Sequence, residues 1–440
     1  MTLHPILADK LNLALRAESI EEMWTRRDAR LPTIRGKVHS VIGMRRAGKT
    51  TFLHQLLRER RTAAPPERAL YIGFDDDRLA GIASEQLGFL LEEYYRRHPA
   101  LRRRETVSWF LDEIQLVPGW DRFARRVLDT ERCEIVVSGS SAHMLSREVH
   151  TSLRGRGMAT VIRPFSFREY LRYRGEEPAA VWRPLPEERS LVEKRFREYL
   201  VEGGFPEAQG LDAPTRIELL QGYVDTVLFR DVVERYKVSQ VEALRWLVRH
   251  CLRNPAGNFS VHRLHGDLRS QGLGVAKDVV HAMLGHLVDA FLLSALPLAT
   301  ESERRRNSNP RKVYPSDPGL IRAFDASGRA NLGHALETAI MNELERRGAE
   351  VGYVRTEDGL EIDFLARYPS RGAELLQVCA DVSDAATLSR ELRGLTAAGK
   401  EHRRVPRRLL VLDRDAVPRS APPGVEVLPA YEWLLESASG

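Results

Sequence analysis

The stretch Lys37-Val-His-Ser-Val-Ile-Gly-Met-Arg-Arg-Ala-Gly-Lys-Thr-Thr-Phe-Leu-His-Gln-Leu-Leu57 decides the fold of the N-terminal part of this chain. The apolar run 38–42 predicts a β-strand, and the apolar residues within 52–57 recur at helical spacing. Gly43, Gly48, Lys49 and Thr50 lie between them with the spacing G-x-x-x-x-G-K-[ST]. A chance match of a Gly-rich turn is the alternative, but the strand–loop–helix context favours a phosphate-binding P-loop, the Walker A motif.

The P-loop predicts a nucleotide site. Backbone N–H groups and the helix N-terminus attract phosphate, Lys49 adds a positive charge, and the Thr50 hydroxyl is a ligand for Mg²⁺. The residues expected to bind nucleotide are Gly43, Met44, Arg45, Arg46, Ala47, Gly48, Lys49, Thr50 and Thr51.

A second apolar run, 107–111, ends in Asp112 and Glu113, in the manner of a Walker B motif. The carboxyl ends of buried parallel strands point toward the ligand crevice. We therefore expect Asp112 to hold Mg²⁺ and Glu113 to polarise the attacking water. A strand that merely leads into a helix cap is the alternative, but together with the P-loop the acid pair predicts an ATP hydrolase with ATP and Mg²⁺ as cofactors.

A third strand, 134–138, ends in Ser138 and is followed by Gly139-Ser140-Ser141. The hydroxyls of Ser138 and Ser140 could contact the γ-phosphate or the attacking water. A helix N-cap formed by Ser140 or Ser141 explains the same residues equally well.

The order of these motifs, followed by Leu153-Arg-Gly-Arg156 and by 161–170, resembles the AAA+ superfamily of ATPases. Gly203-Gly-Phe-Pro-Glu207 and the segment 229–236 are similar to one prokaryotic AAA group, and this resemblance extends over about residues 15–415. It implies an arginine finger, Arg156 or Arg154, that completes the site of a neighbouring subunit in a ring-type homo-oligomer. An Arg-rich surface loop is the alternative.

Length and composition set wider limits. A chain of 440 residues is expected to form two to four domains, and 43% hydrophobic with 29% charged residues is ordinary for a soluble protein. No apolar run reaches eighteen residues, so no membrane span is expected. Three widely spaced cysteines make neither a disulfide framework nor a zinc cluster, which fits the cytoplasm. The net charge of +6 is too mild to indicate nucleic acid.

The predicted fold class is α/β, with a doubly wound parallel sheet built on strands near 38–43, 69–74, 107–111, 134–138 and 159–163. The expected domains are an AAA+ nucleotide-binding domain with an N-terminal helical arm (1–165), a helical lid (166–237), a winged-helix-like domain (238–315) and a restriction-endonuclease-like domain (316–440).

The winged-helix prediction comes from helical patterns at 241–252, 261–270 and 275–290, then a strand at 291–296, a charged loop and a strand near Val313. Lys277 of the third helix and Arg304, Arg305 and Arg306 of the loop are candidate DNA contacts. Winged helices also bind proteins, so both kinds of partner remain open.

The C-terminal part resembles the PD-(D/E)xK nuclease core, in which Glu337 and Asp363 match the metal-binding acids. Gln377 stands where a second metal carboxylate belongs, and Cys379 where a lysine belongs. An amide lacks the charge that a hard cation needs, and an ordinary thiol carries no positive charge. We therefore expect a nuclease fold without nuclease activity.

These features favour an oligomeric ATP-driven motor or remodeller of duplex or branched DNA, such as four-way junctions. The alternatives are a regulatory switch in which ATP controls a protein partner and, least favoured, an ATP-coupled nuclease.

Overall fold

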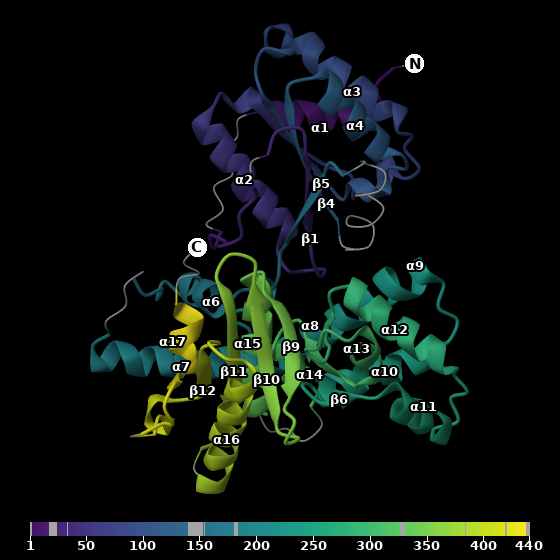
Figure 1. The fold of residues 1–440 in the computed structure, drawn as a ribbon. Helices are drawn as coiled ribbons and strands as arrows, with labels where there is room; N and C mark the ends of the chain where they lie inside the picture. Colours follow the sequence, from purple (N-terminus) through teal and green to yellow (C-terminus); the bar gives the residue numbers. More distant parts are fainter. Residues whose placement is uncertain are drawn as a thin grey trace. The chain divides into compact units, whose positions relative to one another are not determined.

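The computed structural model describes residues 2–16, 24–32, 34–139, 153, 155–179, 184–325, 331–382, 384–418 and 420–436. The chain forms two compact units, Met1–Arg163 and Pro164–Gly440 (Figure 1). Among the described residues, no helix has both the length and the apolar character that crossing a bilayer requires.

The first unit is built on a five-stranded sheet with the order β2-β3-β4-β1-β5, in which every neighbouring pair is parallel. Its strands are β1 (Val38–Ile42), β2 (Ala69–Gly73), β3 (Val107–Asp112), β4 (Cys133–Ser138) and β5 (Gly157–Val161). Its helices are α1 (Pro5–Leu15), α2 (Lys49–Ala63), α3 (Glu85–Arg97) and α4 (Trp120–Thr130). The parallel α/β sheet predicted from the sequence is confirmed.

Burial explains why these strands are nearly continuous apolar runs. Every residue of β1 and β3 is buried, because helices cover both faces of the sheet; α2 lies on one side and α3 and α4 on the other (Figure 1). Phe52, Leu53 and Leu57 of α2 pack against Phe110 and Val136 of the sheet. The order β3-β4-β1 places the carboxyl ends of these three strands side by side.

The second unit begins with helices. They are α6 (Phe167–Tyr173), α7 (Pro186–Glu202), α8 (Ala213–Thr226), a π-helix (Val227–Val233), α9 (Glu234–Tyr236), α10 (Val241–Arg253), α11 (Val261–Ser270), α12 (Lys277–Asp289), α13 (Glu303–Ser308), α14 (Gly319–Phe324) and α15 (Leu332–Arg346). The charged loop expected before Val313 contains the short helix α13. Ser302 caps it by accepting a hydrogen bond from the Arg305 N–H, and Glu303 lies in its first turn.

Two sheets complete this unit. A three-stranded antiparallel sheet has the order β6-β8-β7 and comprises β6 (Asn258–Phe259), β7 (Leu293–Leu296) and β8 (Arg311–Pro315). A mixed sheet has the order β13-β12-β11-β10-β9 and comprises β9 (Glu350–Arg355), β10 (Glu361–Tyr368), β11 (Gly372–Cys379), β12 (Arg407–Val411) and β13 (Val425–Pro429). The remaining helices are α16 (Ala385–Glu401) and α17 (Ala430–Leu435). Single 3₁₀ turns in the two units cover Pro66–Arg68, Asp77–Leu79, Pro99–Leu101, Ile114–Leu116, Pro206–Ala208 and Arg414–Ala416.

Side chains alternate between the two faces of the mixed sheet. Leu375 packs with Leu395 of α16 in one apolar cluster. Leu376, the next residue along β11, packs with Ile340 of α15 and Trp433 of α17 in another. This period of two is what a strand buried on both faces requires.

The glycine pair Gly203-Gly204 follows α7 where the backbone passes against two other segments. A Cβ on Gly203, whose φ is 78°, would lie 1.9 Å from Asp317 Oδ1, and one on Gly204 would lie 2.2 Å from the Phe165 carbonyl oxygen. The buried Asp317 carboxylate accepts hydrogen bonds from the N–H groups of Gly204 (2.6 Å) and Gly319 (2.9 Å). Close packing therefore explains why glycine occupies both positions.

Candidate nucleotide site

The loop between β1 and α2 contains three residues with positive φ. Gly43 and Gly48 have φ values of 144° and 95°, and Arg46 has a φ of 65°. A Cβ on Gly43 would lie 2.1 Å from the Ile162 carbonyl oxygen, so only glycine fits there. The helix α2 begins at Lys49, with the first N–H groups of the helix next to the loop.

Lys49 is held inside this loop. Its side chain is buried, with 6% exposed, and its Nζ donates to the carbonyl oxygens of Gly43 (3.2 Å) and Met44 (3.1 Å). The guanidinium of Arg27 donates to the Ala47 carbonyl (2.9 Å) and to the Arg163 carbonyl. The N-terminal segment thus fixes the middle of the loop, a role for Arg27 that no motif in the sequence indicated.

Asp112 is the centre of the acidic half of the site and is 3% exposed. Its Oδ2 accepts hydrogen bonds from Thr50 Oγ1 (2.8 Å) and Tyr71 OH (2.7 Å), and its Oδ1 accepts one from Ser138 Oγ. Helix α2 and strands β2, β3 and β4 therefore meet at one carboxylate. The hydroxyl of Thr50 and the carboxylate of Asp112 are hard oxygen ligands that adjoin each other, so these residues fit Mg²⁺.

Tyr71 was not identified from the sequence. Gly73 pairs with Asp112 across β2 and β3, and it has no side chain to block the phenol two residues earlier. Burial raises the pKa of Tyr71 well above its usual value, and the negative charge of Asp112 raises it further. The phenol therefore stays neutral and donates a hydrogen bond to the carboxylate.

Glu113 follows directly at the end of β3. Its φ of 52° lies in the left-handed region, and its N–H donates to Ser138 Oγ (3.1 Å). Its carboxylate accepts a hydrogen bond from Gln115 Nε2. Ser138 thus orients both acids of the pair, Asp112 through the side chain and Glu113 through the backbone.

Arg156, one of the two candidate arginine fingers, lies at the amino end of β1, whereas the P-loop follows the carboxyl end of this strand. The Arg156 carbonyl accepts from the N–H of Val38, the first residue of β1, and its guanidinium forms an ion pair with Asp129 of α4. The five residues of β1, Val38–Ile42, extend over about 16 Å before the P-loop begins. Arg156 therefore does not reach its own P-loop, and Arg154, Ser140 and Ser141 lie outside the described residues.

The candidate DNA contacts lie on two elements of the second unit. Lys277 starts α12 and its Nζ lies 3.0 Å from His262 Nδ1. Arg304 and Arg305 of α13 are exposed, whereas Arg306 forms ion pairs with Glu303 and Glu350.

Of the four nuclease-like positions, Glu337 and Asp363 lie around one side chain. Glu337 and Asp363 both lie within 3.5 Å of Lys312 Nζ. Gln377 bonds to the backbone N–H of Asp363 and to Glu391, and the Cys379 thiol donates to the Asp381 carbonyl. Only the two acids therefore share a site.

Parts of the chain match two described protein families, and most of the chain is similar to two individual proteins. Residues 35–171 match the family described as an AAA domain, and residues 193–331 match a domain of unknown function, DUF8612. The uncharacterized protein MJ1544 of Methanocaldococcus jannaschii is 30% identical over 401 residues, which cover 90% of this chain and 85% of that protein. An uncharacterized protein of Haemophilus influenzae is 26% identical over 402 residues, 90% of this chain and 94% of the relative.

Among solved structures, the chain is similar to the Walker-type ATPase PABY2304 of Pyrococcus abyssi. The identity is 16%, the TM-score is 0.40, and the match covers 74% of this chain and 96% of the other.

Proposed function

We propose a function from one premise: the chain belongs to the protein family of MJ1544, and it carries an AAA domain at residues 35–171. In this proposal the chain binds ATP with Mg²⁺ at the P-loop and hydrolyses it. The supporting observation is the 2.8 Å contact between Thr50 and Asp112, because a magnesium–nucleotide complex needs a P-loop hydroxyl and an acidic strand end side by side.

Each residue then has a defined task. Lys49 turns its ammonium from the loop carbonyls to the phosphates, and Glu113 takes a proton from the attacking water. The water oxygen bonds to the γ-phosphorus while the bond to the β–γ bridging oxygen breaks. Bound Mg²⁺ supplies charge neutralisation for the phosphates and would be held by Thr50 and Asp112.

The variant Glu113→Gln tests this assignment. It removes the base but keeps the size of the side chain, so ATP binding should remain and phosphate release should slow by about 100-fold or more. ATP binding is measured with a fluorescent analogue and turnover by phosphate release. Glu85→Gln, at an exposed position in the first turn of α3, is the matched control. Full turnover in Glu113→Gln would show that the acid pair is misassigned.

We further propose that the active form is a ring-type homo-oligomer in which Arg156 or Arg154 completes the neighbouring site. The ion pair of Arg156 with Asp129, near the amino end of β1 and remote from its own P-loop, supports an action in trans. Such a finger contributes on the order of a thousandfold in rate in related phosphoryl transfers.

DNA is the substrate in this proposal, with residues 166–237 as lid, 238–315 as a winged-helix-like domain and 316–440 as an inactive nuclease-like domain. Support comes from the order of α10, α11, α12, β7 and β8, and from the exposed Arg304 and Arg305. Exposed basic side chains such as these bind phosphates in a salt-dependent way.

ATPase activity measured with single-stranded, duplex and four-way-junction DNA tests the DNA role. We expect stimulation that falls with salt and that is lost in the double variant Arg304→Ala/Arg305→Ala. The double variant Arg96→Ala/Arg390→Ala removes the same charge from exposed positions elsewhere and should keep the stimulation. An ATPase rate that none of the DNA forms changes would instead favour a regulator of a protein partner.

A further inference from the structure

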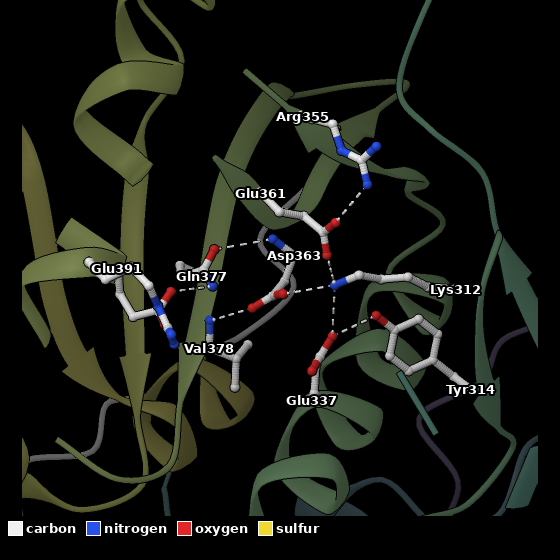
Figure 2. A network of polar contacts seen from close by, with 10 residues as sticks. Lys312, Tyr314, Glu337, Arg355, Glu361, Asp363, Gln377, Val378 and Glu391 are labelled. Carbon is white, nitrogen blue, oxygen red and sulfur yellow. Dashed lines mark hydrogen bonds and ion pairs between the residues drawn. The ribbon is translucent and has the colours of Figure 1, made fainter. Parts of the chain in front are cut away.

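A buried ammonium in the second unit is surrounded by three carboxylates (Figure 2). Lys312 Nζ lies 3.0 Å from Asp363 Oδ1, 3.0 Å from Glu361 Oε1 and 3.5 Å from Glu337 Oε1. The lysine is 4% exposed and comes from β8, whereas the acids come from β10 and α15. An ammonium has three N–H donors, so the three carboxylates match its hydrogen-bonding capacity.

Other contacts hold the carboxylates in this arrangement. Tyr314 OH donates to Glu337 Oε1 (2.7 Å), and the N–H of Val378 donates to Asp363 Oδ2 (3.0 Å). Figure 2 shows the carboxylates of Glu337, Glu361 and Asp363 pointing at Lys312. The cluster is therefore a built site whose occupant is a side chain of the same protein.

The positions that would complete a metal site face elsewhere. Gln377 accepts from the Asp363 N–H (3.2 Å) and donates to Glu391 (2.8 Å), and the Cys379 thiol bonds to a carbonyl outside the cluster. With Lys312 lying among them, the three acids are not placed as metal ligands: within the described part of the chain, no three His, Cys, Asp or Glu side chains are arranged to hold a metal ion. The observed cation is the lysine.

The cations that face the cluster are side chains of the protein itself. Burial alone would lower the pKa of Lys312, but attraction by Asp363, Glu337 and Glu361 outweighs it, so the amine stays charged. Burial and the charge of Asp363 raise the pKa of Glu337 above its usual value. A second cation, Arg355, lies 3.5 Å from Glu361.

We propose that Lys312 is an internal cation that occupies the carboxylate cluster in place of a divalent metal ion, and so joins β8 to the mixed sheet. A buried acid cluster that lost this partner would be left with uncompensated charge. A hard divalent ion, which prefers carboxylate oxygens, would then have a site to enter. The strand that carries Lys312 belongs to the small sheet, so the ion pairs tie the two sheets of the second unit together.

The variant Lys312→Met tests the proposal in the full chain without nucleotide. Removing one partner of a buried ion pair should lower the thermal midpoint by on the order of 10 °C in EDTA. Millimolar Mn²⁺ should restore much of this loss, because the freed carboxylates can bind it. Lys400→Met makes the same chemical change at an exposed position of α16 and should show neither effect. An unchanged midpoint, or a lowered one that Mn²⁺ does not raise, would overturn the proposal.

A second measurement does not depend on how the lysine variant folds. Mn²⁺ binding is counted by electron paramagnetic resonance in the wild-type chain and in Asp363→Asn. We expect equal stoichiometry, because the cluster binds no Mn²⁺ while Lys312 occupies it, and any ion at the nucleotide site is common to both. A bound ion present in the wild type and lost in Asp363→Asn would overturn the proposal.

Discussion

Replacing Lys49 by Met should separate nucleotide binding from the stability of the fold. The side chain is buried in the P-loop, and its ammonium bonds to the carbonyl oxygens of Gly43 and Met44. These partners are neutral, so the substitution leaves no bare charge on them, and methionine has nearly the same length. We expect the unfolding free energy without nucleotide to change by no more than about 1 kcal/mol.

The effect on ligand binding is much larger. ATP at about 100 times its Kd stabilises a folded domain by about 2.7 kcal/mol. For a unit of the size of Met1–Arg163 this is a rise in Tm of roughly 5–10 °C. Loss of a charged contact to phosphate, worth about 1.5–3 kcal/mol, raises the Kd about 10- to 150-fold. At the same ATP concentration the stabilisation then falls to between about 0.3 and 1.4 kcal/mol.

Thermal unfolding with and without Mg²⁺ and a non-hydrolysable ATP analogue measures both quantities. The matched control is Lys37→Met, because Lys37 also donates to a backbone carbonyl, that of Gly155 (2.7 Å), at the other end of β1. The control should keep the full nucleotide-dependent rise in Tm. A Lys49→Met protein that keeps it as well would refute a phosphate site in this loop.

Three further predictions follow from other contacts. Arg156→Ala should lower turnover with little change in ATP affinity. Mixing it with Glu113→Gln should give an activity above the sum of the two, because the first variant keeps Glu113 and the second keeps Arg156. Additive rates would exclude an action in trans. Burial raises the pKa of Asp317 to about 6, so the folded chain keeps a proton that the unfolded chain releases above about pH 4. The unfolding free energy should therefore fall by up to about 3 kcal/mol as pH rises through this window, and Asp317→Asn should flatten the slope; an equal slope in denaturant titrations of both proteins would contradict this. Gly204→Ala should lower the unfolding free energy by about 1–3 kcal/mol because its Cβ would meet a backbone carbonyl. Gly222→Ala in α8, with open space around it, should raise the unfolding free energy by about 0.5–1 kcal/mol. Equal thermal midpoints of the two variants would disprove the close packing at Gly204.

The sequence predicted the first unit well because its signals are local. Each strand is a short apolar run, and the residues after β1 and β3 carry the P-loop and the acid pair. Parallel strands bring such ends together whatever the details of packing. This rule was enough to predict that Thr50 and Asp112 lie close together.

Contacts made across long sequence separations could not be predicted. Tyr71 reaches Asp112 over 41 residues, and Lys312 reaches Asp363 over 51. Neither belongs to a motif with Asp112 or Asp363, so only the packed chain shows that they meet. The resemblance to the nuclease core indicated that Cys379 stands where a lysine belongs. In the structure, Lys312 of β8 brings an ammonium to the two acids of that core, Glu337 and Asp363. The roles of Ser140 and Arg154 stay predictions.

The anchoring of the P-loop has a consequence for the entropy of binding. Gly43 packs closely against the Ile162 carbonyl, and Arg27 donates a hydrogen bond to the Ala47 carbonyl. Lys49 donates to two further carbonyl oxygens of the loop. Ordering a flexible backbone costs about 1–2 kcal/mol per residue. Because folding has already ordered this loop, an arriving triphosphate does not meet that cost, and the loop is preorganised for its ligand.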